Sequence, residues 1–153
     1  VVATQTGNPS TTPTSNKNHI LRMRCAKDSS GGQGLACKLE LRQGYASETS
    51  LGTFIAAVLA EDVPDLFQTY RYRLTEAQAA LITDYTDLQM RFLMRKNGSP
   101  GALRRVQLSY ADFEIPNDDT NDRDLRLTVQ ESTLLARGEQ IGGVTQILTG
   151  TAL

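Results

Sequence analysis

The sequence predicts an all-β fold, namely a β-sandwich or jelly roll with one short helix. Apolar residues recur with period two in most segments between His19 and Pro116, as in strands with one buried face. Segments rich in Gly, Pro, Asn and Ser separate these stretches, as turns do. With 39% hydrophobic residues, the chain of 153 residues has enough apolar material for one core, and two facing sheets would bury the inner sides of so many strands.

The chain divides into three predicted parts. Residues 1–18 form an extended N-terminal arm, because this segment is rich in Thr, Ser, Asn and Pro and has no periodic apolar face. Residues 19–116 form the β-sandwich body. Residues 117–153 form a polar acidic linker and a C-terminal strand-forming tail, which either adds to the sheet edge of a neighbouring subunit or completes the body's own sandwich.

A hairpin is predicted at the start of the body. Ile20–Lys27 and Leu35–Arg42 both alternate, and they flank the glycine-rich segment DSSGGQG. One register satisfies both faces of this hairpin, since apolar side chains then meet apolar ones and opposite charges meet. The predicted pairs are Leu21 with Leu41, Met23 with Leu39, Cys25 with Cys37 and, on the other face, Arg22 with Glu40, with Arg24 and Lys38 nearby.

The middle of the body predicts two strands and a short helix. Leu51–Ala60 is nearly all apolar, which indicates a strand covered on both faces, with a buried helix as the alternative. Phe67–Leu74 alternates, with Tyr70, Tyr72 and Leu74 on one side and Arg71 and Arg73 on the other. In the segment TEAQAALI, Thr75 caps a short helix and Gln78 returns a hydrogen bond to the cap.

Two further strands and a bulge end the body. Asp87–Lys96 places alternate apolar residues inward, namely Leu88, Met90, Phe92 and Met94. After the turn NGSPGA, Leu103–Ile115 also alternates, but its phase slips between Tyr110 and Ala111, which predicts a β-bulge. The alternating residues are Val106, Leu108 and Tyr110 before the slip and Ala111, Phe113 and Ile115 after it.

Composition and charge disfavour several functions. A net charge of −1 gives no global basic field for nucleic acid, and no apolar run approaches the roughly 18 residues of a membrane span. One histidine, two cysteines and no tryptophan leave few groups for catalysis or metal binding. The sequence therefore predicts a protein that is not an enzyme. It predicts no catalytic, cofactor or metal site, and neither nucleic acid nor membrane as a partner.

The candidate chemical groups each have a structural interpretation, which we favour. Cys25 and Cys37 are interpreted as free, buried thiols, with a disulfide as the alternative. His19 is interpreted as a surface or boundary residue instead of a catalytic base. Clustered acidic residues are interpreted as solvated positions instead of a cation site. These are Asp118, Asp119, Asp122 and Asp124 in the linker, and Glu61, Asp62 and Asp65 around Pro64.

Basic and aromatic residues are the remaining candidates. Several basic residues could form a strip that binds phosphates or the acidic surface of a protein. The other interpretation is that they are ordinary exposed arginines, which are common on the solvent face of strands. The strip would combine Arg91, Arg95, Lys96, Arg104 and Arg105 of one predicted hairpin with Arg71 and Arg73. A sugar-stacking surface is the corresponding interpretation of Tyr45, Tyr70, Tyr72, Tyr85 and Tyr110. For Tyr70, Tyr72 and Tyr110 we favour core positions.

Residues 19–116 resemble a jelly-roll module of tailed-bacteriophage virion proteins. The resemblance is carried by YRYRLTEAQAALITDYTDLQMRF and RRVQLSYADFEIP, with HILRMRCAKDSSGGQ and LELRQG as the opening hairpin. The module's pattern is a strand, Leu-Thr, a short alanine-rich helix, an Ile-Thr-Asp-Tyr-x-Asp-Leu segment, a strand and a closing Arg-Arg-hydrophobic strand that ends in Pro. Such modules sit on the outside of virions, on capsids or on tail fibres.

The resemblance implies a non-enzymatic structural role and carries over no catalytic residues. Because the module stands nearly alone between two arms, we expect a capsid decoration (cement) protein that binds across neighbouring subunits of the major capsid protein. Its location would be the outer capsid surface of the virion, after synthesis in the host cytoplasm. We expect a homo-oligomer, with a trimer favoured. The alternative is a carbohydrate- or receptor-binding module of a phage tail, fibre or surface protein.

Overall fold

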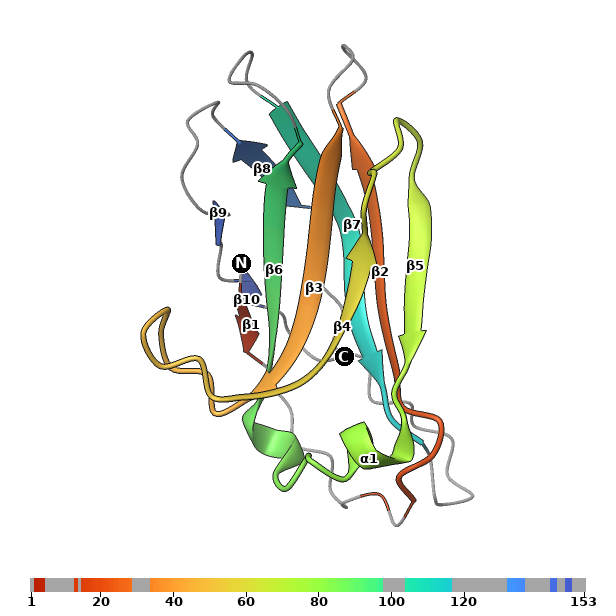
Figure 1. Ribbon diagram of the computed structural model, residues 1–153, viewed down its shortest axis with the longest axis vertical. Coiled ribbons are helices and arrows are strands. Elements are labelled where there is room, and N and C mark those ends of the chain that lie inside the picture. The colour runs from red at the N-terminus through yellow and green to blue at the C-terminus, as the bar shows by residue number, and fades with distance from the viewer. Residues whose placement is uncertain are drawn as a thin grey trace.

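The computed structural model describes most of the predicted body and several short strands outside it (Figure 1). The backbone is described for residues 2–4, 13, 15–28, 34–97, 104–116, 132–136, 144–145 and 148–149. Side chains are described for residues 13, 15–28, 34–97 and 105–116. Within these ranges the prediction of an all-β fold with one short helix is confirmed, because strands dominate and α1 (Glu76–Ala79) is the one α-helix.

The strands form two sheets, in which every pairing is antiparallel except that of β1 with β10. Sheet A has the order β10-β1-β6-β3-β4, and β9 also pairs with β6. Its strands are β1 (Val2–Thr4), β3 (Leu35–Gln43), β4 (Thr53–Ala60), β6 (Leu88–Lys96), β9 (Val144–Thr145) and β10 (Leu148–Thr149). Sheet B has the order β5-β2-β7-β8. Its strands are β2 (Ile20–Lys27), β5 (Gln68–Arg73), β7 (Arg104–Glu114) and β8 (Ser132–Ala136).

One apolar core takes side chains from both sheets. Leu21 of sheet B and Leu39 and Phe92 of sheet A are each fully buried in it. The inward residues predicted for β6, which are Leu88, Met90, Phe92 and Met94, are all buried, so this prediction is confirmed. In Figure 1 the long strands of both sheets run along the long axis of the molecule, and α1 lies at one end.

The predicted hairpin at the start of the body is wrong, because β2 and β3 belong to different sheets. β2 pairs with β5 and β7, and β3 pairs with β4 and β6. Cys25 and Cys37 nevertheless meet, with their Sγ atoms 3.4 Å apart, and both are free, buried thiols as predicted. Arg22 and Glu40 do not pair, since they contact other partners on different sheets. Inward-facing residues approach one another across two packed sheets as well as along one, so alternation alone does not separate the arrangements.

The second predicted hairpin is wrong for the same reason. β6 lies in sheet A and β7 lies in sheet B, so the two strands do not pair with each other. The arginines expected on one hairpin are therefore divided between two sheets. Arg91 and Arg95 are on β6, whereas Arg104 and Arg105 are on β7.

The apolar segment Leu51–Ala60 forms strand β4, and the alternative of a buried helix is excluded. The expectation that both of its faces are covered is wrong. Phe54 and Leu59 are 45% and 48% exposed, because β4 is the last strand of sheet A.

The short helix begins at the predicted cap. Thr75 Oγ1 accepts a hydrogen bond from the Gln78 backbone N–H (3.2 Å), and Gln78 Oε1 accepts one from the Thr75 N–H (2.9 Å). The segment after α1 contains the 3-10 turn η1 (Tyr85–Asp87), whose Tyr85 is buried.

His19 is fully buried, so its interpretation as a surface or boundary residue is wrong. Its Nε2 lies 2.7 Å from Tyr85 Oη, and its ring stacks against Tyr85 and Phe113 with centroid distances of 5.8 Å. The neighbouring polar segment suggested exposure, but the η1 turn and β7 cover this position.

A register shift in the pairing of β2 with β7 confirms the predicted irregularity. Arg24 pairs with Tyr110 but Cys25 pairs with Leu108, so Ser109 is the extra residue. The bulge therefore precedes Tyr110 instead of following it. The core position predicted for Tyr110 is wrong, because its hydroxyl lies 3.3 Å from Thr69 Oγ1 in an exposed contact.

The short strands outside the predicted body pair within the chain's own sheets. β1 and β9 pair with β6, β8 pairs with β7, and β10 pairs with β1. For the described part of the tail, the structure thus adopts the alternative in which the tail completes the chain's own sheets. The division into 1–18, 19–116 and 117–153 stays a prediction. The acidic linker residues 117–124 lie outside the described residues.

Candidate functional site

The outer faces of the two sheets both carry charged side chains, which form different contacts on each sheet. We define face A by the outward residues of β3, β4 and β6, and face B by those of β5, β2 and β7. On face A these include Lys38, Glu40, Arg42, Phe54, Leu59 and Arg91, and on face B they include Ile20, Arg22, Arg24, Thr69, Arg71, Arg73, Tyr110, Asp112 and Glu114.

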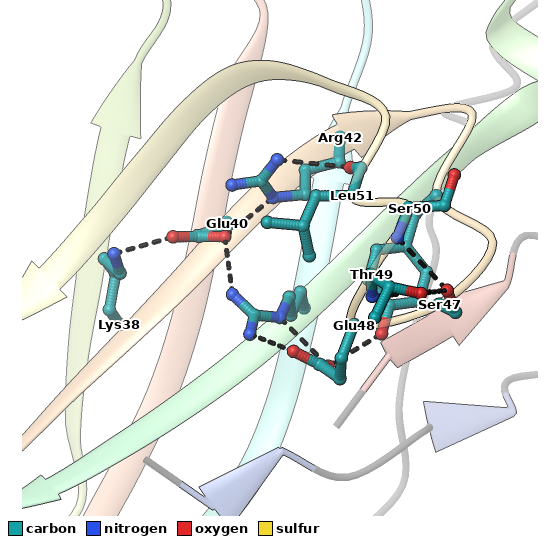
Figure 2. A network of polar contacts seen from close by, with 10 residues as sticks. Lys38, Glu40, Arg42, Ser47, Glu48, Thr49, Ser50 and Leu51 are labelled. Carbon is teal, nitrogen blue, oxygen red and sulfur yellow. Dashed lines mark hydrogen bonds and ion pairs between the residues drawn. The ribbon is translucent and has the colours of Figure 1, made fainter. Parts of the chain in front are cut away.

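Face A centres on one buried carboxylate. Glu40, in the interior strand β3, is only 3% exposed. Lys38 Nζ and Arg42 Nε lie 2.6 and 2.8 Å from its two carboxylate oxygens. Arg91 Nη1, from the neighbouring strand β6, lies 3.3 Å away. Figure 2 shows Glu40 between Lys38 and Arg42. Three cations thus compensate the cost of burying one carboxylate.

The loop between β3 and β4, residues 44–52, is held to face A by polar contacts (Figure 2). Glu48 accepts hydrogen bonds from the Arg91 guanidinium and, at 2.7 Å, from the Tyr45 hydroxyl. Arg42 Nη1 donates to the Leu51 carbonyl at 3.1 Å. Gly52, at a φ of +62°, closes the loop where an added Cβ would lie 2.2 Å from the Gln43 carbonyl oxygen.

These contacts shift the protonation equilibria of face A toward the charged forms. Burial by itself raises the pKa of Glu40, but hydrogen bonds from Lys38 and Arg42 outweigh it, so the pKa lies below its ordinary value. Burial lowers the pKa of Arg91, but Glu48 and Glu40 raise it by more. Each charged group of this network on face A therefore has an oppositely charged partner within it.

Face B distributes its charges differently. Arg22, on the interior strand β2, forms ion pairs with both carboxylates of β7. It contacts Glu114 directly, and its Nη1 lies 3.6 Å from Asp112 Oδ2. The acidic partners available on this face are thus taken by one arginine.

The other arginines of face B lie toward its β5 edge. Arg24 packs over the Phe67 ring, with its guanidinium carbon 5.7 Å from the ring centroid, and donates to Thr69 Oγ1 at 3.3 Å. Arg71 and Arg73 are exposed, and within the described ranges neither forms an ion pair. Together with Ile20 they line a hollow of about 210 Å³. This part of face B is chemically suited to bind an anionic group.

Most of the exposed large apolar side chains among the described residues lie in one segment of the chain, on β4 and its connection to β5. Where side chains are described, five large apolar residues are more than a third exposed, and four of them lie between Thr53 and Gln68. We call these four the edge cluster: Phe54 (45%), Leu59 (48%), Leu66 (82%) and Phe67 (37%). The fifth, Leu81, follows α1. The sequence identified the apolar character of β4 but not its exposure, which depends on its place at the end of sheet A.

The predicted basic strip does not form as one surface. Arg91 is neutralised on face A, Arg71 and Arg73 lie on face B, and Arg95 pairs at 4.0 Å with the equally exposed Glu61. Lys96 continues the inward row of β6, and the Arg104 side chain lies outside the described residues.

The tyrosines do not form one surface either. Tyr70 and Tyr72 pack against the core, as predicted, and Tyr85 is buried. Tyr45 contacts the loop residue Glu48 on face A, and Tyr110 lies on face B. A single sugar-stacking platform of these five residues is therefore absent from the described structure.

Within the described ranges, three or more metal-ligating side chains nowhere gather in a group that could hold a metal ion. No helix in those ranges is long and apolar enough to cross a membrane. Comparison of the chain with models of protein families gives no match. Comparisons with curated proteins and with solved structures likewise give none.

Proposed function

We propose that the two sheets form a jelly-roll sandwich, and that the chain is a non-enzymatic structural protein of a tailed-phage virion. It decorates the outer surface of the capsid and stabilises it by binding across neighbouring subunits of the major capsid protein. The resemblance of residues 19–116 to a virion module supports this setting. Nested strand pairing supports the jelly roll, since β2 pairs with β7 and β3 pairs with β6, as in a ribbon that is folded back and rolled up.

The observation that carries the binding role is the edge cluster. Soluble proteins expose single apolar residues routinely, but several large ones on one edge strand and the connection that follows it favour a contact surface. Phe54 and Leu59 lie on the last strand of sheet A, and Leu66 and Phe67 lie on the connection to sheet B. A partner that covers this edge would remove apolar surface from water at about 25 cal/mol per Å².

The stabilising effect follows from mass action. A protein that binds the assembled shell but not its separate subunits shifts the equilibrium toward the shell, by an amount set by its concentration and dissociation constant. A symmetric oligomer, with a trimer favoured, presents several copies of the edge cluster and so gains avidity on a repeating lattice. The chain needs no chemical step for this role.

The test is co-sedimentation of the purified chain with shells of the phage that encodes it. We expect Leu59→Asp and Leu66→Asp each to weaken shell binding at least tenfold. Leu81→Asp is the matched control, because Leu81 is as exposed as Leu59 but lies outside the edge cluster. Unchanged binding by both edge variants, or an equal loss in the control, would contradict the role of the edge cluster. Far-ultraviolet circular dichroism would check that each variant is folded.

The native mass, measured by light scattering after size exclusion, separates this proposal from its alternative. A discrete trimer supports the decoration protein. A monomer that binds defined sugars on a glycan array would instead support a carbohydrate- or receptor-binding module of a phage tail, fibre or surface protein.

A further inference from the structure

Strand β5 (Gln68–Arg73) is an edge of sheet B. It pairs with β2 along one side, and no other strand of the described residues pairs with it on its second side. An edge strand presents a row of backbone N–H and C=O groups to whatever extended segment approaches it.

The backbone direction of β5 identifies which groups face the open side. The Leu74 N–H donates to the His19 carbonyl at 2.9 Å, across to the start of β2. Hydrogen-bonding groups alternate in direction along an antiparallel strand. Tyr72 and Tyr70 therefore point their N–H and C=O groups toward β2, whereas Arg71 and Arg73 point theirs toward the open side.

The same two residues carry the charge at this edge. The Arg71 and Arg73 side chains are exposed on face B, and residues two apart along a strand are separated by roughly 6.6 Å. On β2, Ile20 pairs with Arg73 and Arg22 pairs with Arg71, and Arg22 already forms ion pairs with Asp112 and Glu114. Cations on an edge strand repel a basic strand and disfavour a neutral one, which would desolvate them without compensation, but they attract an acidic strand.

We propose that β5 binds an extended acidic segment of a partner protein, which adds to sheet B as a further strand with two carboxylates at alternate positions opposite Arg71 and Arg73. An added strand has the same two-residue spacing as β5, so both carboxylates meet guanidinium groups in one register. Backbone hydrogen bonds provide affinity, and the charge-assisted pairs select the sequence and register. The inference goes beyond the proposed function, because it names a ligand chemistry for sheet B and its test requires no capsid.

The test measures binding of fluorescent peptides to the full chain by anisotropy. The probe is a short peptide in which aspartate and threonine alternate. One comparison peptide has asparagine in place of aspartate, and another has the parent sequence with all backbone amides N-methylated. We expect the parent peptide to bind, the asparagine peptide to bind at least tenfold more weakly, and the N-methylated peptide not to bind. Added salt should weaken binding of the parent peptide.

Protein variants locate the site. We expect Arg71→Gln with Arg73→Gln to weaken binding of the parent peptide about tenfold, since two cross-strand charge pairs of modest strength are lost. Arg95→Gln is the matched control, because Arg95 is an exposed strand arginine of sheet A. It should bind the peptide as the unaltered chain does.

Three results would overturn the proposal. Equal binding of the N-methylated peptide would mean that charge alone attracts the ligand and no strand is added. Binding of an acidic polysaccharide that depends on Arg71 and Arg73, without binding of the peptide, would assign the surface to anionic sugars. If neither the peptide nor the polysaccharide binds, the two arginines serve only to keep this edge from pairing.

Discussion

The two outer faces of the molecule use arginine in opposite ways. On face A, the Arg42 and Arg91 side chains are about one-tenth exposed and both contact Glu40. On face B, Arg22 takes both neighbouring carboxylates, and the exposed Arg71 and Arg73 form no ion pair among the described residues. The comparison shows that residue type alone does not distinguish a structural cation from one available to a ligand. The distance to the nearest carboxylate and the degree of burial determine whether an arginine stabilises the fold or is available to a ligand.

The arginines of the two faces differ because the acidic residues lie on different strands relative to them. Glu40 lies on the interior strand β3, with Lys38 and Arg42 on the same strand and Arg91 on the neighbouring strand β6. Glu48 belongs to the loop between β3 and β4. On face B, the acidic residues lie on β7, and β2 separates them from β5. We therefore expect substitutions on face A to change stability and substitutions on face B to change binding.

The largest expected effect is that of Glu40→Gln. The substitution removes the charge that three cations surround, and we expect the free energy of unfolding to fall by about 2 kcal/mol, less than for a fully enclosed pair because Lys38 remains partly in water. Urea unfolding followed by circular dichroism measures it. A loss no greater than that caused by Arg71→Gln would contradict the contrast between the faces.

The loss of stability at low pH should also depend on the Glu40 carboxylate. The pKa of Glu40 is lower in the folded protein than its ordinary value, so its contribution to stability is complete above that ordinary value and is lost as pH falls through the folded-state pKa. Urea unfolding from neutral pH down to about pH 3 should therefore show a shallower acid loss for Glu40→Gln than for the unaltered chain. Arg73→Gln should keep the original slope. If the free energy of unfolding of Glu40→Gln falls with pH as steeply as that of the unaltered chain, Glu40 does not contribute to the acid sensitivity.

Arg91→Gln should have a smaller effect, which is partly local. Arg91 joins Glu40 to Glu48, so its loss should release loop 44–52 from face A and reduce stability by about 1 kcal/mol. Limited proteolysis should then cut the loop faster, with the cleavage site read by mass spectrometry. Arg24→Gln provides the comparison from face B. Equal protection of the loop in both variants would show that Arg91 does not hold it.

The smallest expected effect is that of Arg71→Gln combined with Arg73→Gln on folding. Both side chains are exposed, so the free energy of unfolding should change by less than about 0.5 kcal/mol. Chemical denaturation measures this, and the same protein serves in the peptide-binding test. A stability loss comparable to that of Glu40→Gln would mean that the two faces do not differ as described.

Local patterns in the sequence predicted much of the secondary structure correctly. The Thr75 and Gln78 spacing located the helix cap, and period two identified the buried residues of β6. The irregularity of β7 was also predictable, although it lies at Ser109 and so turns Tyr110 outward. These features depend on hydrogen bonds and on alternation between residues that are close in the chain, so the order of residue types is sufficient to predict them.

The candidate site was only partly predictable. Alternation correctly separated Arg71 and Arg73 from the apolar side of β5. It did not reveal that β5 is an edge strand, that β4 exposes Phe54 and Leu59, or that Glu40 is buried. Each of these depends on which strands lie beside and above the residue in question.

The sequence by itself determined that the chain is β-rich, which side chains of most strands share a face, and where the helix begins. Only the tertiary structure decided which strands are neighbours. Cys25 and Cys37 illustrate the reason, since their contact was predicted along a hairpin but occurs between two sheets. A period of two records the side to which a residue points, and that side is the same whether the next strand lies within the sheet or across the core.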